Sequence, residues 1–395
     1  MAIAKNIKAV ISGSSFIRLM FEKGAKLKAL HGQDKVFDFS LGNPNLKPPK
    51  QFKEELIKVA SLDKEGIHGY MPNAGLPETR ESVATYISTE QEITVSKDEI
   101  IMTCGAAGGA NVTFKTILNP DDEVIVPSPY FVEYSFYVSN FNATLKTVET
   151  KEDFSLDLEA IRKAITPKTK VMLINSPNNP TGQIYSDESL AKLGDILREK
   201  SQEYGNIIFL VADEPYRKIV YDGVVVPSVF KHYKESILLT SYSKDLSIPG
   251  ERLGFIAVHP KATDRSDLIT GMTLTNRTLG FVNAPALMQR AIINVQGLSV
   301  DMSQYTRKRQ ILCDGLKKAG YEFNIPPGSF YLFIKSPIPD DIEFINMLQE
   351  ELIMAVPGSA FGKTGYFRLA YCTSDETIKN SLPAFEKVMN KCKNK

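Results

Sequence analysis

The chain has 395 residues, more than one hydrophobic core usually supports, so we expect a large domain with a second, smaller one. Its 47 basic and 46 acidic residues give a net charge of +1, which argues against nucleic acid or an anionic membrane as partner. The four cysteines lie far apart without a paired CxxC spacing, which indicates neither a disulfide framework nor a zinc site. Reduced thiols and no bound metal are expected.

The N-terminal segment, residues 1–30, carries charges that interrupt each apolar stretch before it could form a signal-peptide core or a membrane span. An amphipathic presequence is the alternative, but Glu22 and the direct continuation into Ser40-Leu-Gly-Asn-Pro favour a short structured helix. We therefore expect a cytoplasmic protein.

The central region alternates short apolar runs with longer amphipathic segments such as 188–204, which is an α/β pattern. The runs do not alternate with polar residues, so we expect strands buried on both faces of a mainly parallel sheet. Helices on both sides would complete a three-layer α/β/α arrangement. The runs are residues 123–129, 171–177, 206–216, 236–244 and 252–260.

After about residue 290 the pattern changes to long helical stretches, 301–319 and 341–352, with short strands at 330–335 and 366–371. These elements predict a smaller α+β domain, completed by the N-terminal segment. The expected division places residues 1–48 and 290–395 in the small domain and residues 49–289 in the large one.

Several apolar runs of the large domain end in polar, sharply turning motifs. Because ligands of open α/β sheets bind beyond the carboxyl ends of the strands, these motifs should converge on one crevice. They begin at Pro127, Asn175, Asp213 and Ser241.

Lys244 ends one apolar run, in Ser241-Tyr-Ser-Lys, and is followed by Ile248-Pro-Gly-Glu-Arg252. An isolated lysine is usually a solvated surface charge. A lysine shielded from water can instead lose its proton, attack an aldehyde and shuttle a proton, which an arginine cannot do. This region resembles the active-site lysine region of the class I/II aminotransferases, fold-type I pyridoxal-phosphate enzymes. The resemblance, of the aspartate aminotransferase type, extends over about residues 37–371.

The resemblance implies that Lys244 holds pyridoxal 5'-phosphate as a Schiff base and then moves the substrate's α-proton. It pairs Asp213 with the ring nitrogen, and Tyr216 and Asn179 with the phenolic oxygen. From the residues alone, a carboxylate after so apolar a run requires a cation, with a helix N-cap or a surface salt bridge as the alternative. Asn178-Asn-Pro-Thr-Gly alone would be only a turn.

Residues 102–111 are short of side chains and precede a predicted helix over 110–118, which suits a phosphate near free backbone N–H groups. The GxGxxG spacing of a dinucleotide site is absent, and tight helix packing is the alternative explanation. The resemblance places the phosphate against Gly105, Ala106 and Ala107, with further contacts from Ser241, Ser243 and Arg252. Many relatives have a hydroxyl residue where Ala106 or Ala107 stands, so one contact would come from the backbone alone.

The resemblance also implies an aromatic ring over the cofactor, for which Phe131 matches and Tyr130 is the alternative; ordinary core packing is the competing explanation. It assigns the substrate α-carboxylate to Arg368, whose planar guanidinium suits bidentate binding. An edge-strand arginine facing water is the alternative, but the preceding loop, 356–362, favours the functional role. Asn179 is expected to contact the substrate too.

Gly42, in Ser40-Leu-Gly-Asn-Pro, resembles the loop that closes over the substrate, where glycine permits close backbone approach. Tyr70 matches a tyrosine that reaches the phosphate of the neighbouring subunit. The resemblance therefore implies a homodimer in which Tyr70 serves the neighbouring active site.

The predicted function is an enzyme of amino-acid metabolism that moves an amino group from an L-amino acid to a 2-oxo acid in two ping-pong half-reactions. Another pyridoxal-phosphate reaction, such as C–S β-elimination, decarboxylation or ring closure, is the alternative on the same fold. A non-catalytic sensor is a third hypothesis, against which the missing DNA-binding domain and the low net charge argue.

Aspartate or glutamate with 2-oxoglutarate is the substrate hypothesis, and aromatic and alanine donors remain alternatives. Arg277 is a candidate for binding a distal carboxylate, with a solvated helix arginine as the other explanation.

Overall fold

A computed structural model of the protein describes residues 2–4, 7–8 and 16–394. The helix expected in the N-terminal segment is α2 (Phe16–His31); most of the segment before it lies outside the described residues. Among the described helices, none is both long and apolar enough to cross a membrane. All four cysteines are free.

The largest sheet has seven strands in the order β2-β8-β7-β6-β5-β3-β4. The neighbouring strands from β7 to β4 pair in parallel, whereas β8 is antiparallel to both β7 and β2. The mainly parallel sheet that the apolar runs predict is therefore confirmed. Its strands are β2 (Ile100–Thr103), β3 (Glu123–Ser128), β4 (Thr144–Glu149), β5 (Thr169–Asn175), β6 (Phe209–Asp213), β7 (Ser236–Ser241) and β8 (Gly254–Val258).

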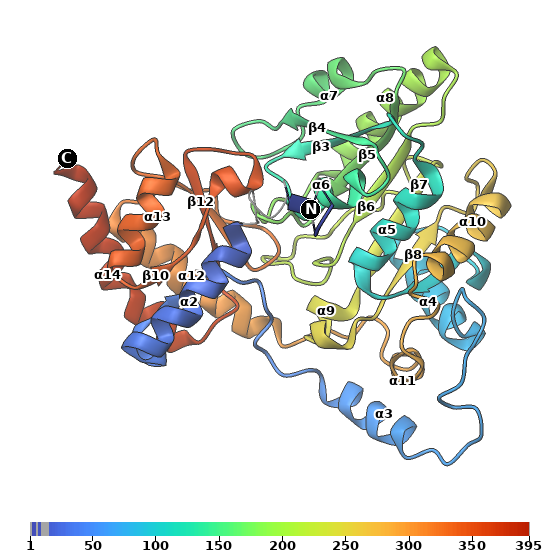
Figure 1. The fold of residues 1–395 in the computed structure, drawn as a ribbon, viewed down its shortest axis with the longest axis horizontal. Helices are drawn as coiled ribbons and strands as arrows, with labels where there is room; N and C mark the ends of the chain where they lie inside the picture. The colour runs from blue at the N-terminus through green and yellow to red at the C-terminus, as the bar shows by residue number, and fades with distance from the viewer. Residues whose placement is uncertain (1, 5–6, 9–15, 395) are drawn as a thin grey trace.

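Helices cover both faces of this sheet. Successive residues of a strand point to opposite faces, so neighbouring residues enter different cores. Leu210 and Ala212 enter a core with α4 (Pro77–Glu90), α7 (Leu158–Ala164), α8 (Asp187–Tyr204) and α11 (Ala286–Ala291). Val211, between them, enters a core with α5 (Gly105–Ile117), α6 (Glu133–Ser139) and α10 (Arg265–Thr278). The three layers are thus confirmed (Figure 1). Helix α3 (Lys50–Ala60) packs on α11.

Helix α8 shows how local sequence sets these boundaries. The Ser186 side chain accepts a hydrogen bond from the backbone N–H of Ser189, and Asp187 and Glu188 lie in the positively polarised first turn. Gly205 ends the helix in the left-handed conformation, with φ 61°, which glycine adopts without steric cost. The helix follows the predicted amphipathic segment within one residue.

A second group of elements is built from the two ends of the chain. Strand β1 (Phe37–Asp38) pairs in parallel with β10 (Ile353–Met354), and α2 lies beside the orange and red helices in Figure 1. An antiparallel sheet, β11-β12-β9, packs with them into one core. The other elements are β9 (Tyr331–Lys335), β11 (Val356–Pro357), β12 (Tyr366–Ala370), α12 (Met302–Ala319), α13 (Asp341–Glu350) and α14 (Asp375–Lys393). The elements expected after residue 290 occur within two residues of their predicted bounds.

The segment that follows β6 connects this group to the large sheet. Tyr216, Ile219 and Tyr221 leave the carboxyl end of β6 and enter the core formed by the chain ends. The second group of elements therefore stands against the edge of the sheet where the parallel strands end. Short helical turns complete the described structure: α9 (Tyr242–Asp245), η1 (Gln33–Lys35), η2 (Lys97–Glu99), η3 (Pro249–Glu251) and η4 (Gly358–Phe361).

Candidate active site

A cavity of about 270 Å³ lies where the parallel strands end. Asn175, Asp213 and Ser241, the last residues of β5, β6 and β7, reach it side by side, as the placement of ligands in open α/β sheets predicts. Residues of the chain-end group close its other side. The lining consists of Leu41, Gly42, Ala106, Ala107, Ala110, Phe131, Tyr134, Tyr137, Asn175, Asn179, Asp213, Pro215, Tyr216, Ser241, Ser243, Lys244, Pro249, Arg252, Tyr331 and Arg368.

All the site residues that the sequence predicts line this cavity except Gly105 and Tyr70. Gly105 stands directly behind the lining, since a Cβ atom there would come within 2.8 Å of Arg252 Nη2. Tyr70 lies outside the cavity and is 94% exposed. Of the two aromatic candidates, Phe131 lines the cavity and Tyr130 does not. Arg277 is exposed on α10 and likewise lies outside the lining.

Asp213 is a buried carboxylate with one open oxygen. Its Oδ2 accepts a hydrogen bond of 2.5 Å from the Tyr134 hydroxyl, whereas Oδ1 is buried without a hydrogen-bond partner among the described residues. Burial raises the pKa of Asp213 to about 7, and the bond from Tyr134 acts in the opposite direction. The surface salt bridge considered as an alternative is wrong, because the side chain is buried and pairs with no cation of the described chain.

Lys244 lies on the turn α9, directly after β7. Its Nζ donates a hydrogen bond of 2.9 Å to the carbonyl oxygen of Gly42, which belongs to the loop from the N-terminal segment. Desolvation, with smaller contributions from Arg368 and Arg252, lowers the pKa of Lys244 to about 8. A solvated surface lysine is therefore excluded, and the amine loses its proton more easily than an exposed one.

A corner suited to an anion lies at the start of α5. This helix begins at Gly105, so the predicted start at 110 was five residues late; the positive φ of Gly105, 72°, sets the turn from β2 into the helix. The first backbone N–H groups of a helix lack intrahelical partners, and Ala106 and Ala107 line the cavity at this point. Arg252, Ser241 and Ser243 line the same cavity. They supply a positive charge and hydroxyl groups.

Arg368 is a buried cation in the centre of the antiparallel sheet. It is 2% exposed, so the alternative of an arginine facing water is wrong. Its Nη1 donates to Asn179 Oδ1 at 3.0 Å and its Nη2 to the carbonyl oxygen of Ser40 at 2.5 Å. The guanidinium stacks on the Tyr331 ring, 4.5 Å from the ring centroid. These contacts hold a planar donor at the cavity wall.

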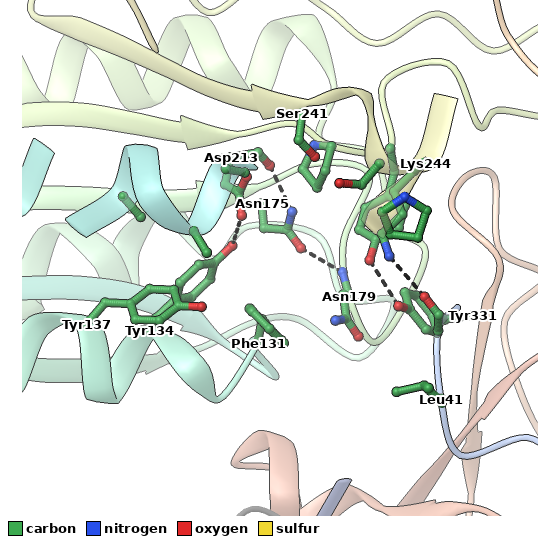
Figure 2. A pocket seen from close by; sticks show the side chains of 18 of the residues that line it. Leu41, Phe131, Tyr134, Tyr137, Asn175, Asn179, Asp213, Ser241, Lys244 and Tyr331 are labelled. Atoms are coloured by element: carbon green, nitrogen blue, oxygen red, sulfur yellow. Dashed lines mark hydrogen bonds between the residues drawn. The ribbon is translucent and has the colours of Figure 1, made fainter. Parts of the chain in front are cut away.

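Several lining residues to which the sequence assigned no role hold the predicted ones in place (Figure 2). Asn175 donates through Nδ2 to the backbone oxygen of Asp213 at 2.8 Å and accepts from the backbone N–H of Asn179 at 2.7 Å. The hydroxyl groups of Tyr216 and Tyr331 are 2.9 Å apart, and a Cβ atom on Gly42 would overlap Tyr331. Asn175 begins one of the motifs that the sequence directs to this crevice, but its hydrogen bonds to Asp213 and Asn179 were not predicted.

The cavity suits pyridoxal 5'-phosphate, which combines a phosphate, a basic ring nitrogen and an aldehyde. The unpartnered Oδ1 of Asp213 is the kind of group that a protonated ring nitrogen would satisfy. The corner at Arg252 and the start of α5 suits the phosphate, and Lys244 lies on the same cavity wall as Asp213. In Figure 2 the Phe131 side chain lies below these groups, where an aromatic face would cover the ring.

Comparisons with known proteins agree with this geometry. The family model for class I and II aminotransferases matches residues 34–385. A probable aspartate aminotransferase from Methanocaldococcus jannaschii is 33% identical over 365 residues, 89% of this chain and 92% of that one. An aspartate/prephenate aminotransferase from Thermus thermophilus is 32% identical over 358 residues, 89% of this chain and 90% of that one.

A crystal structure of an aminotransferase from Eubacterium rectale superimposes with a TM-score of 0.96 at 38% identity, with 99% of both chains covered. The chain therefore belongs to the class I and II aminotransferase family. It is a pyridoxal-phosphate-dependent aminotransferase that transfers an amino group from an amino acid to a 2-oxo acid.

Proposed function

We propose that the enzyme takes aspartate or glutamate as amino donor and 2-oxoglutarate as an acceptor. The support comes from the relatives, because the M. jannaschii protein is named for aspartate and the T. thermophilus protein for aspartate and prephenate. Every donor has an α-carboxylate, which the buried Arg368 suits, so this geometry supports amino-acid binding without selecting the side chain. Arg277 stays a candidate for the distal carboxylate.

The proposed roles of the lining residues follow from their positions. Pyridoxal phosphate, when bound, supplies an aldehyde that bonds to amines and a ring that withdraws electrons from the substrate's α-carbon. Lys244 would hold it covalently and then carry the α-proton at Nζ, for which a pKa near working pH is suited. Asp213 would keep the ring nitrogen protonated.

The other proposed contacts complete the binding site. Tyr216 and Asn179 would donate to the phenolic oxygen, Phe131 would cover the ring, and Arg368 with Asn179 would bind the substrate. The phosphate would bind to the backbone of Gly105, Ala106 and Ala107 and to Ser241, Ser243 and Arg252.

Absorbance spectra of the purified enzyme test the donor preference. Amino acids are added singly, and 2-oxo acids follow. We expect aspartate or glutamate to bleach the absorbance band of the bound cofactor and 2-oxoglutarate to restore it. Bleaching by aromatic amino acids or alanine alone would contradict the proposed donor. Bleaching without any return by an oxo acid would indicate another reaction of the same cofactor. Arg277→Ala extends the test. A loss of activity confined to dicarboxylic donors would assign binding of the distal carboxylate to Arg277.

We also propose a cytoplasmic homodimer in which Tyr70 contacts the phosphate of the neighbouring site. The Tyr70 side chain is 94% exposed and is therefore accessible to a neighbouring subunit. The proposed domain division remains residues 1–48 and 290–395 against residues 49–289. Pairing of β1 with β10 supports it, because this contact joins the two ends of the chain in one core.

A further inference from the structure

Tyr134 is a fully buried tyrosine beneath the cavity, on helix α6 between β3 and β4. Its side chain is 2% exposed, and its ring packs edge-on against Phe131, with centroids 5.5 Å apart. Its hydroxyl reaches across the end of the sheet to Asp213 Oδ2 at 2.5 Å (Figure 2). Helix α6 thus provides a donor to the carboxylate, and Phe131, just before the helix, provides the ring that lies under the cavity.

The Tyr134 hydroxyl makes the two oxygens of Asp213 unequal. Oδ2 is occupied, and Oδ1 is left buried without a partner on a residue that lines the cavity. A buried polar atom without a partner is costly, and such atoms in native structures mark a missing ligand or a functional site. Because Tyr134 is neutral, it orients the carboxylate without cancelling its negative charge, which an arginine or lysine in this position would do.

The remaining ionisable neighbours of Asp213 do not replace this contact. Glu214 follows Asp213 in the chain and disfavours its ionised form. Tyr216 and Tyr137 interact with Asp213 electrostatically and donate no hydrogen bond to its carboxylate. Burial raises the pKa of Tyr134 well above its usual value, so its hydroxyl keeps its proton and remains a donor. Tyr134 is therefore the one side-chain donor to the Asp213 carboxylate among the described residues.

We propose that Tyr134 is a positioning residue that acts through Asp213: it fixes Oδ2 and directs the open, charged Oδ1 at the cofactor's ring nitrogen. The proposal rests on the role proposed above for Asp213. It differs from a packing role, because it depends on the hydroxyl group and not on the ring.

Tyr134→Phe removes the hydroxyl and keeps the ring. Tyr233→Phe is the matched control, because Tyr233 is a buried tyrosine outside the cavity lining. Its hydroxyl donates a hydrogen bond of 2.8 Å to the backbone oxygen of Ile208. We expect Tyr134→Phe to weaken equilibrium binding of pyridoxal phosphate about tenfold, which is typical of a lost bond to a charged group. The control should change it less than about twofold.

A second readout separates positioning from packing. The bond from Tyr134 lowers the pKa of Asp213, so its loss should move the acidic limb of the kcat/KM profile to higher pH in Tyr134→Phe and leave it in place in Tyr233→Phe. A cooperative unfolding transition, measured for both variants without cofactor, would show that each variant is folded. Unchanged cofactor affinity and an unchanged acidic limb in Tyr134→Phe would overturn the proposal.

A double-mutant cycle with Asp213→Asn separates this inference from the proposed function. If Tyr134 acts through Asp213, adding Tyr134→Phe to Asp213→Asn should have almost no further effect on cofactor affinity. A full tenfold effect in that background would overturn the inference and leave the role of Asp213 intact. An Asp213→Asn enzyme with wild-type affinity and activity would overturn both.

Discussion

Three ionisable side chains with little access to water line this cavity. Lys244, Asp213 and Arg368 all carry ionisable groups where water is scarce, which shifts the pKa values of the lysine and the carboxylate toward neutrality. Such groups cost stability unless a ligand or a partner balances them. Their gathering in one cavity therefore indicates a site selected for chemistry and not for stability.

Lys244→Ala tests the proposed role of Lys244 as the catalytic amine. We expect the variant to bind pyridoxal phosphate through the remaining contacts, without a covalent bond to the protein, and to lose activity by roughly 10³-fold or more because the proton carrier is gone. Mass spectrometry after borohydride reduction and a steady-state assay measure both effects. Lys170→Ala, a partly buried lysine outside the cavity lining, is the control and should keep its activity. Normal turnover by Lys244→Ala would refute the assignment.

Asp245, the next residue, provides a test of stability against pH. The residue as a whole is half-buried, but Oδ1 is buried with no hydrogen-bond partner in the described chain, and desolvation raises the pKa of Asp245 to about 8. The folded protein thus holds a proton that the unfolded chain releases near pH 4. The stabilising effect of that proton is complete below about pH 4 and is lost as pH rises to about 8.

Asp245→Asn should therefore become more stable relative to the wild type as pH rises from 5 to 8. We expect the difference in unfolding free energy to grow by about 1 kcal/mol or more, since one pKa unit corresponds to about 1.4 kcal/mol. Urea unfolding at the two pH values measures it. A difference that does not change with pH would show that Asp245 is ionised in the folded protein.

At the scale of elements, strand ends and helix starts build the site. Asn175 on β5 and Asp213 on β6 are paired in register, β7 continues two residues further to Ser241, and the start of α5 adds a turn with free N–H groups. Rigid elements hold these groups more precisely than long loops would. The turn at Gly105 is restricted in two ways, since its positive φ disfavours a side chain and a Cβ atom there would lie 2.8 Å from Arg252 Nη2.

Gly105→Ala should weaken cofactor binding. An alanine at φ 72° is strained by about 1 kcal/mol or more, and its Cβ would push against Arg252 Nη2 from 2.8 Å. We expect about a tenfold rise in the dissociation constant of pyridoxal phosphate, measured by titration of the cofactor-free enzyme. Gly108→Ala, one turn along the same helix, meets only ordinary contacts from 3.4 Å and should bind the cofactor normally. Equal behaviour of the two variants would contradict this explanation.

At the scale of the whole molecule, the two groups of elements form the cavity together. Arg368 and Tyr331 come from the sheet built near the C-terminus, whereas Lys244 and Asp213 come from the large sheet. Gly42 reaches the same cavity from the N-terminal segment. Any shift between the two groups would change the distance between Arg368 and Lys244 and therefore the fit to a substrate.

The proposed dimer can be tested by mixing two variants, Lys244→Ala and Tyr70→Ala, under limiting cofactor. If Tyr70 serves the neighbouring site, half of the randomly paired dimers are mixed and each contains one intact site, so about a quarter of the wild-type activity should return. If Tyr70 serves its own subunit, mixing restores nothing. Light scattering should show twice the chain mass of 43.9 kDa.

Features that depend on local pattern could be predicted from the amino-acid sequence. Continuous apolar runs predicted the buried strands, and their polar ends predicted where Asp213, Asn179 and Lys244 meet, because parallel strands end at one edge of the sheet. The motifs and their order were enough to predict the family and the cofactor. The helix start at Gly105 was not predicted, because the glycines in the first turns of α5 have a low helix propensity.

The contacts that hold the site residues in place depend on long-range packing and could not be predicted from the sequence. Tyr134 and Asp213 are 79 positions apart, Tyr216 and Tyr331 are 115 apart, and Arg368 and Asn179 are 189 apart. No local periodicity encodes such pairs, because they form only when separate elements pack against each other. The burial that shifts the pKa values of Lys244 and Asp213 likewise comes from that packing, so the chemistry of the site is a property of the folded chain.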